Sequence, residues 1–206
     1  MPLVTAHPDF SYFFRILDPT QTPNFYTKWE GNVVRQAAPK WMSTPYRMTG
    51  AGAVLIGARW SVRGLMPTVY ASTDPATLSA EALYKALRRG WQESDFHPLL
   101  TVGMYWKLEL LLDLREPFTL RALRLTYEDI AGVDWENEQA NGREPVTQAI
   151  ARAVFERQAE GLIVPSARRK EGINIVYFPT HRRKDSIIHV LKPESLPPDM
   201  HGLDSD

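Results

Sequence analysis

Residues 57–81 read GARWSVRGLMPTVYASTDPATLSAE. The glycines and the proline in the first half predict a loop, and residues 69–72 predict a short strand. A helix should follow, because Asp74 can cap its first turn and Pro75 suits the first helical position, where a missing N–H costs nothing. The stretch therefore predicts a loop, a strand and a helix in direct succession.

Three side chains on these elements form a candidate site. Arg59 lies in the loop, Tyr70 in the strand and Glu81 in the helix, close enough in the chain to converge in one cleft. An arginine can hold phosphate, an aromatic ring can stack on a planar group, and a carboxylate can face a developing cation. This combination would suit cleavage of a charged N-glycoside.

The order of these residues resembles the RES domain, a bacterial family whose members are mostly toxins of toxin–antitoxin pairs that destroy NAD or transfer from it. The family pattern runs Gly-Gly-Arg-Trp-Asn, then a strand ending in Tyr, then a helix carrying Glu. Further along, Gly161–Arg168 looks like the family's Val-Pro-Ser-Ala segment and contains Ser166, and Asn174 lies in the strand that follows. Upstream, Tyr12–Ile16 looks like the family's opening strand and supplies Arg15.

The resemblance implies an α+β fold similar to ADP-ribosyltransferases, a split β-sandwich with flanking helices and a NAD cleft between its sheets. Segregated short strands and few helices also favour α+β. NAD would be the substrate, and no cofactor is expected, since the chain has no dinucleotide fingerprint.

The resemblance also implies a role for each site residue. Arg59 and Arg15 would bind the NAD pyrophosphate. Tyr70 would stack on nicotinamide, and Glu81 would stabilise the ribosyl cation or orient the attacking group. Ser166 would hydrogen-bond the ribose or the pyrophosphate.

Ordinary explanations exist for the same residues. Glu81 could pair with Lys85 on a solvated helix face, Tyr70 could be a half-buried core residue, and Arg59 could stack on Trp60. The apolar face of that helix is predicted to avoid Glu81 and to comprise Leu78, Ala82, Leu83, Ala86 and Leu87.

The reaction itself has alternatives. Transfer to water gives a glycohydrolase, transfer to phosphate a phosphorylase, and transfer to a side chain a protein ADP-ribosyltransferase. A non-catalytic RES-like binding module is the alternative from another class, because Ala58 and Ser61 stand where the family has glycine and asparagine.

Composition narrows the classes of protein. The 206 residues carry 24 Lys+Arg against 24 Asp+Glu and no cysteine, so neither nucleic acid nor a membrane surface is an expected partner. The histidines show no metal-ligand spacing, so no metal is predicted. We expect one domain over residues 1–206 in the cytoplasm, with a core at about 12–191 and loose ends at 1–9 and 193–206.

Periodicity and turn residues predict the remaining elements. Strands are predicted at 11–17, 101–112, 161–164, 173–178 and 186–191, and helices at 74–89 and 145–159. Residues 20–50 are predicted to be irregular with a short helix at 25–34, residues 120–130 to include a short helix after Thr126, and residues 134–144 to form an exposed loop.

The proline-interrupted stretch 20–50 is a candidate partner surface. It carries Trp29, Trp41 and Tyr46, and exposed aromatic residues often anchor protein interfaces. The partner would be a helix-turn-helix antitoxin, as the family implies, or a second copy of the chain. Alternatively these aromatic side chains pack inward.

Overall fold

The computed structural model describes residues 4–37, 46–88, 90 and 100–192. Six strands form one sheet in the order β1-β2-β5-β4-β3-β6, and β1 also pairs with β3, which closes the first five strands into a ring. The strands are β1 (Tyr26–Ala37), β2 (Val69–Ser72), β3 (Leu100–Asp113), β4 (Gly161–Pro165), β5 (Ile173–Tyr177) and β6 (Ile187–Val190). The fold is therefore mixed α+β with a barrel-like sheet.

The ring is held unevenly. β1 and β3 are antiparallel and pair from Tyr26 opposite Leu112 to Ala37 opposite Leu100. By contrast, β1 and β2 share the single pair Val34 and Ser72. One long ladder and one short junction therefore flank β1.

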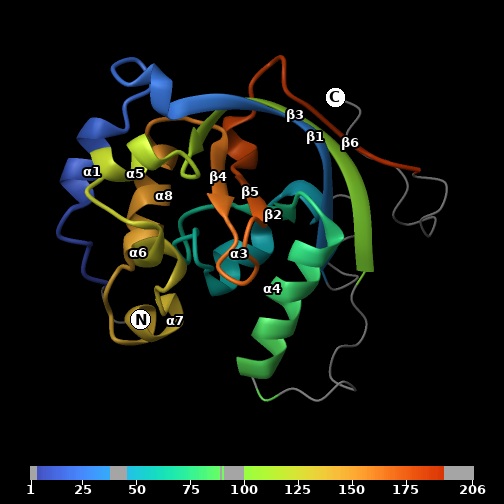
Figure 1. The fold of residues 1–206 in the computed structure, drawn as a ribbon, viewed down its shortest axis with the longest axis horizontal. Helices are drawn as coiled ribbons and strands as arrows, with labels where there is room; N and C mark the ends of the chain where they lie inside the picture. Colours follow the sequence, from blue (N-terminus) through green and yellow to red (C-terminus); the bar gives the residue numbers. More distant parts are fainter. Residues whose placement is uncertain (1–3, 38–45, 89, 91–99, 193–206) are drawn as a thin grey trace.

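Helices cover the ring on opposite sides (Figure 1). Figure 1 shows β1 and β3 curving together around the shorter strands, with α1, α5, α6 and α8 gathered on one side and α4 on the other. The helices are α1 (Phe10–Ile16), α3 (Ala51–Ile56), α4 (Pro75–Arg88), α5 (Pro117–Ala122), α6 (Tyr127–Ala131), α7 (Trp135–Ala140) and α8 (Val146–Glu156); short 3-10 turns occur at Pro23–Phe25, Tyr46–Met48 and Pro179–His181.

Two hydrophobic clusters fill the two faces of the central strands. Leu162 and Val164 of β4 face the cluster under α1 and α8, whereas Ile163 faces the cluster enclosed by β1, β3 and β6. Successive side chains of a strand point to opposite faces. Burial on both faces therefore explains the continuous apolar run in β4.

A buried carboxylate ties the far end of the ring together. Glu160 is fully buried, and one of its oxygens accepts the backbone N–H groups of Glu109 and Leu110 at 2.6 and 3.1 Å. Its other oxygen accepts from the Arg183 N–H at 2.8 Å and from the Ser186 hydroxyl at 2.6 Å. β3, the start of β4 and the approach to β6 therefore converge on one side chain.

The predicted strands β2 to β6 and the helices α4, α6 and α8 are confirmed within a few residues at their ends. The predicted loose tail, residues 193–206, lies outside the described part of the chain. Among the described residues, every helix is too short or too polar to traverse a lipid bilayer.

The predicted strand at 11–17 is wrong, because this segment forms α1. Phe10, Phe13, Phe14 and Leu17 recur at helical spacing, and this face packs toward α8, with Phe13 and Leu17 buried. The aromatic content favoured a strand, but the spacing of those aromatic residues decides the structure.

The predicted helix at 25–34 is also wrong. Residues 26–37 form β1, whose exposed and half-buried positions show no clear alternation. Pairing along β3 determines this strand, and that partner is remote in sequence. Trp29 is half-buried and packs against the hydrophobic cluster enclosed by β1, β3 and β6, which agrees with the alternative that these aromatic side chains pack inward. Trp41 and the side chain of Tyr46 lie outside the described part of the chain.

Two smaller corrections concern α7 and α4. Residues 135–140, predicted as loop, form a helix capped by Asp134, whose side chain accepts the Asn137 N–H at 3.3 Å. On α4 the predicted apolar face is wrong in part: Leu83 and Leu87 are 54% and 68% exposed, although Ala86 is buried. α4 contacts the sheet mainly through β1 and β2.

Candidate active site

A cavity of about 560 Å³ lies where the loop before β2 meets α3, α4 and the end of β4. Arg59, Tyr70 and Glu81 all line it, so the structure brings together the three side chains singled out from residues 57–81. Their convergence follows from the predicted succession of loop, strand and helix. Arg15 is not brought to this site.

Glu81 projects from α4 and is held at one oxygen. The Ser166 hydroxyl donates to Glu81 Oε1 at 2.7 Å, and the Asn174 amide Nδ2 donates to the same oxygen at 3.1 Å. In the described part of the chain no donor reaches Oε2. The side chain of Lys85, the alternative partner, lies outside the description.

Ser166 is buried at the start of the loop that follows β4. Its hydroxyl oxygen accepts the backbone N–H groups of Arg168 at 3.1 Å and Arg169 at 3.2 Å while its proton goes to Glu81. The tight loop requires Gly172, because a Cβ there would lie 2.6 Å from Thr77 Oγ1 and 3.0 Å from the Ser166 Cβ. The hydroxyl therefore orients the Glu81 carboxylate and also stabilises the loop.

Arg59 is anchored by the end of α6. Its Nη1 donates to the carbonyl oxygens of Ile130 at 3.0 Å and Ala131 at 3.3 Å. Burial lowers the pKa of Arg59, and the positive charge of Arg168 lowers it further, whereas Glu81 acts in the opposite direction. Two arginines that repel each other beside a cavity create a favourable position for an anion.

Tyr70 is half-buried, and its hydroxyl accepts the Trp60 backbone N–H at 3.0 Å. Burial raises the pKa of Tyr70, and a tyrosine is already neutral at physiological pH without such a shift, so the phenol keeps a proton to donate. The ring thus fixes the Arg59 loop and also lines the cavity.

The two departures from the family pattern fit this loop. Ala58 and Ser61 exchange backbone hydrogen bonds at 3.0 and 3.1 Å, which closes a tight turn around Arg59 and Trp60. The Ser61 hydroxyl is buried and donates to the Met66 carbonyl at 2.9 Å. The serine therefore stabilises the loop from within.

Arg15 lies on the exposed face of α1, with its guanidinium carbon 5.9 Å from the centre of the Tyr12 ring, and is not among the residues that line the cavity. Its assignment depended on an opening strand that does not form. Arg35 of β1 lines the cavity instead. Burial, together with the positive charge of nearby Arg47, lowers the pKa of Arg35 to about 10.

Sequence reasoning missed Arg35 and Ser72. Both line the cavity, but β1 lacks apolar alternation and a lone serine in a strand carries no signal. Arg168 also lines the cavity, and its guanidinium carbon lies 3.2 Å from the centre of the Tyr84 ring.

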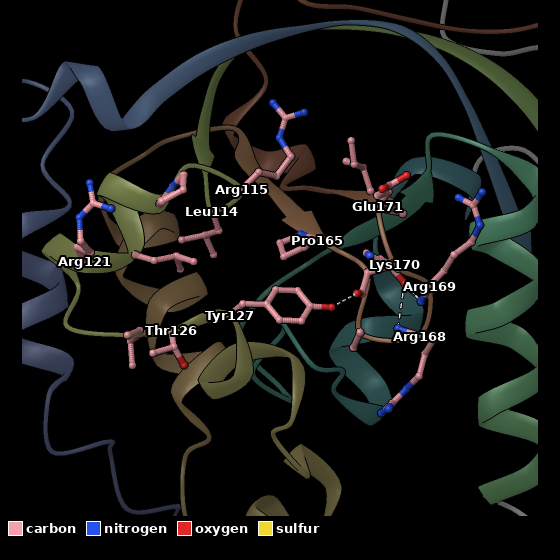
Figure 2. Close-up of a pocket in the computed structure, with 17 residues that line it drawn as sticks. Leu114, Arg115, Arg121, Thr126, Tyr127, Pro165, Arg168, Arg169, Lys170 and Glu171 are labelled. Atoms are coloured by element: carbon pink, nitrogen blue, oxygen red, sulfur yellow. Dashed lines mark hydrogen bonds between the residues drawn. The ribbon is translucent and has the colours of Figure 1, made fainter.

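A second cavity, of about 870 Å³, lies on the other side of the loop from Pro165 to Gly172. Figure 2 shows the Tyr127 ring pointing across it, and the Tyr127 hydroxyl donates to the Ser166 carbonyl at 2.8 Å. Arg115 and Arg121 lie at its rim. α6 thus holds both Arg59 and the Ser166 loop.

No group of three or more His, Cys, Asp or Glu side chains that could hold a metal ion occurs among the described residues. The cavity instead combines a carboxylate on one wall with arginines around it. This arrangement can bind a phosphate-bearing ligand and place a cationic centre against Glu81.

Comparisons with known proteins give a consistent result. The family model described as RES domain matches residues 32–199. The NAD(+) phosphorylase MbcT from Mycobacterium tuberculosis H37Rv, and its counterpart from Mycobacterium bovis, are 27% identical over 143 residues, which is 62% of this chain and 69% of the relative.

A solved structure shares the fold. The M. tuberculosis MbcT–MbcA toxin–antitoxin complex contains a chain that is similar with a TM-score of 0.66 at 18% identity, covering 90% of this chain and 91% of that one. The family match begins at residue 32, after Tyr12–Ile16 and within β1.

Proposed function

Because the chain belongs to the RES domain family, we propose that it is a toxin that consumes NAD by cleaving the nicotinamide–ribose bond. The 27% identity to an NAD(+) phosphorylase supports this reaction class. The observation that carries the proposal is Glu81, a carboxylate that lines the cavity with one oxygen held by Ser166 and Asn174 and arginines around it.

In the proposed reaction the bond between the anomeric carbon and the nicotinamide nitrogen breaks, and its electron pair neutralises the ring. Glu81 stabilises the positive charge left on the ribosyl group through Oε2, and Tyr70 stacks on nicotinamide. Water or phosphate then bonds to the anomeric carbon. Since the leaving group is already cationic, little acid catalysis is required.

The arginines would bind the pyrophosphate. Arg59 and Arg168 lie together beside the cavity, and Arg35 takes the place first assigned to Arg15. Ser166 acts mainly on Glu81, since its proton is donated to that carboxylate. NAD is substrate in this scheme, with no cofactor.

Purified protein incubated with NAD, with and without phosphate, tests the proposal. Free ADP-ribose identifies a glycohydrolase, and phosphorylated ADP-ribose identifies a phosphorylase. Label carried from NAD onto a protein supports the alternative, a protein ADP-ribosyltransferase. Intact NAD with no label transferred favours a non-catalytic RES-like module.

Arg59→Lys should raise the Michaelis constant for NAD, because a lysine ammonium cannot reproduce the planar fork of a guanidinium. The loss of a charged hydrogen bond corresponds to about 1.5–3 kcal/mol. Steady-state kinetics measure the Michaelis constants. Arg63→Lys is the control, since Arg63 is an exposed arginine of the same loop and is not among the residues that line the cavity. Equal constants for both variants would make Arg59 an ordinary loop residue.

A protein antitoxin, of helix-turn-helix type as in the family, is the proposed partner, and the cytoplasm the proposed location. Exposed apolar side chains lie on the two helices beside the cavity, namely Leu55 and Ile56 of α3, which line it, and Leu83 and Leu87 of α4, all between 54% and 68% exposed. Clustered exposed apolar residues are typical of interfaces. A second copy of the chain is the alternative occupant.

Leu87→Glu should weaken antitoxin binding, because it places a charge in an apolar interface. Ile187→Glu, at an exposed apolar position of β6, is the matched control. Hydrogen exchange should show added protection in α3 and α4 when the antitoxin is present. Equal binding by both variants and unchanged exchange in these helices would place the partner elsewhere.

We also propose a single domain over residues 1–206 and kinship with the ADP-ribosyltransferase sandwich. The two hydrophobic clusters on opposite faces of β4 and β5 support a two-layered core of that kind.

A further inference from the structure

Ser72 and Asn174 are neighbours across two strands beneath Glu81. They lie directly opposite each other in the antiparallel pair of β2 and β5, so their side chains share one face of the sheet. Ser72 is 3% exposed, and its hydroxyl donates to Asn174 Oδ1 at 2.7 Å. The pair thus forms a partly buried contact that connects β2 to Asn174 at the site.

The hydroxyl fixes which end of the Asn174 amide meets the carboxylate. An asparagine presents an acceptor on one side and two donors on the other. With Oδ1 accepting from Ser72, Nδ2 points to Glu81 Oε1, where it donates at 3.1 Å. The reverse orientation would set two oxygens without a proton against each other.

We propose that Ser72 is a positioning residue for the cleavage of NAD, acting through Asn174 on Glu81. The inference rests on the proposed function. Ser72 and Asn174 hold Oε1 from the sheet while Ser166 holds it from the loop. Two donors from different elements leave the carboxylate little freedom to rotate, and Oε2 is kept toward the ribosyl group.

Two other roles for Ser72 make different predictions. Ser72 lines the cavity, so it could contact NAD itself, and its loss would then raise the Michaelis constant. As a purely structural hydrogen bond it would affect the melting temperature and not the turnover of folded enzyme. Positioning lowers kcat at an unchanged Michaelis constant, because the carboxylate acts in the transition state.

The test compares Ser72→Ala with Thr73→Val. The Thr73 hydroxyl donates to the Ile173 carbonyl at 3.3 Å, so the control removes a neighbouring bond between the same ends of β2 and β5. For Ser72→Ala we expect kcat to fall by about tenfold, with the Michaelis constant within about twofold of the wild type. Thr73→Val should keep kcat, and Ser72→Thr, which retains the hydroxyl, should restore most of it.

A double-mutant cycle identifies the route. If Ser72 acts through Asn174, Ser72→Ala should cause no further loss of kcat in an Asn174→Ala background. Additive losses, an unchanged kcat for folded Ser72→Ala, or a raised Michaelis constant alone would each overturn the inference.

A second readout separates this inference from the proposed function. The NMR signal of the Asn174 side-chain amide should shift in both Ser72→Ala and Glu81→Gln and stay in place in Thr73→Val. Wild-type protein that leaves NAD intact would overturn the proposed function, whereas an amide signal unmoved by Ser72→Ala would overturn the positioning contact.

Discussion

Glu81→Gln should lower the rate of nicotinamide release by at least about a hundredfold, the effect typical of losing preorganised electrostatic stabilisation. Glutamine has the shape of glutamate and can still accept from Ser166 and Asn174 through its carbonyl oxygen. It carries no charge, so the ribosyl cation loses its counter-ion. Release of nicotinamide from NAD in single turnovers measures the effect.

The matched control is Glu136→Gln. Glu136 also lines the cavity, but it lies on α7 and its nearest basic partner is Arg88, at 3.7 Å. This variant should release nicotinamide at close to the wild-type rate. A Glu81→Gln protein with a normal melting temperature and undiminished release would remove Glu81 from the mechanism.

The second large effect concerns stability and lies far from the cavity. Glu160→Gln should destabilise the fold by about 2–3 kcal/mol. The amide nitrogen of glutamine is itself a donor, so the N–H groups that now donate to that end of the carboxylate would lose their acceptor. Glu160 is fully buried and accepts from three backbone N–H groups and the Ser186 hydroxyl. No rotation of the amide satisfies all of them.

Urea unfolding of Glu160→Gln beside Glu156→Gln measures the difference in the free energy of unfolding. Glu156 lies on α8 with its side chain 40% exposed and pairs only with Arg152 within the described chain, so its substitution should change stability by less than about 0.5 kcal/mol. Equal stability of the two variants would mean that solvent reaches the Glu160 carboxylate.

The predictable part of the fold is the part with strong local patterns. β3, β4 and β5 are apolar enough to be identified from sequence, and α4 carries its own start signal at Asp74 and Pro75. The Asp74 carboxylate accepts the Thr77 N–H at 2.9 Å, as a helix cap should. The loop, strand and helix of residues 57–81 followed from such signals.

β1 could not be predicted in the same way. Its partner β3 lies more than sixty residues further along the chain, and its own residues are mostly polar and only half-buried. The sequence prediction placed Arg15 rather than Arg35 at the cavity for the same reason. It expected the arginine on a strand at residues 11–17, a segment that forms α1, and did not identify β1 as a strand.

The contact between Ser72 and Asn174 that orients Glu81 could not be predicted from the sequence either. Ser72 and Asn174 are 102 positions apart, and only the pairing of β2 with β5 makes them neighbours. A sequence motif records which groups perform the chemistry; the groups that orient them depend on strand register, which no local pattern of a single sequence specifies.

The junction between β1 and β2 sits beside the cavity. Arg35 directly follows Val34, and Val34 and Ser72 form the single residue pair that joins these strands. Arg35 is also paired with Val102 in the long β1–β3 ladder, so that ladder rather than the single rung determines where the arginine lies. The wall of the cavity that carries Arg35 is therefore secured along its β3 edge, whereas its β2 edge is the least extensively paired junction of the barrel.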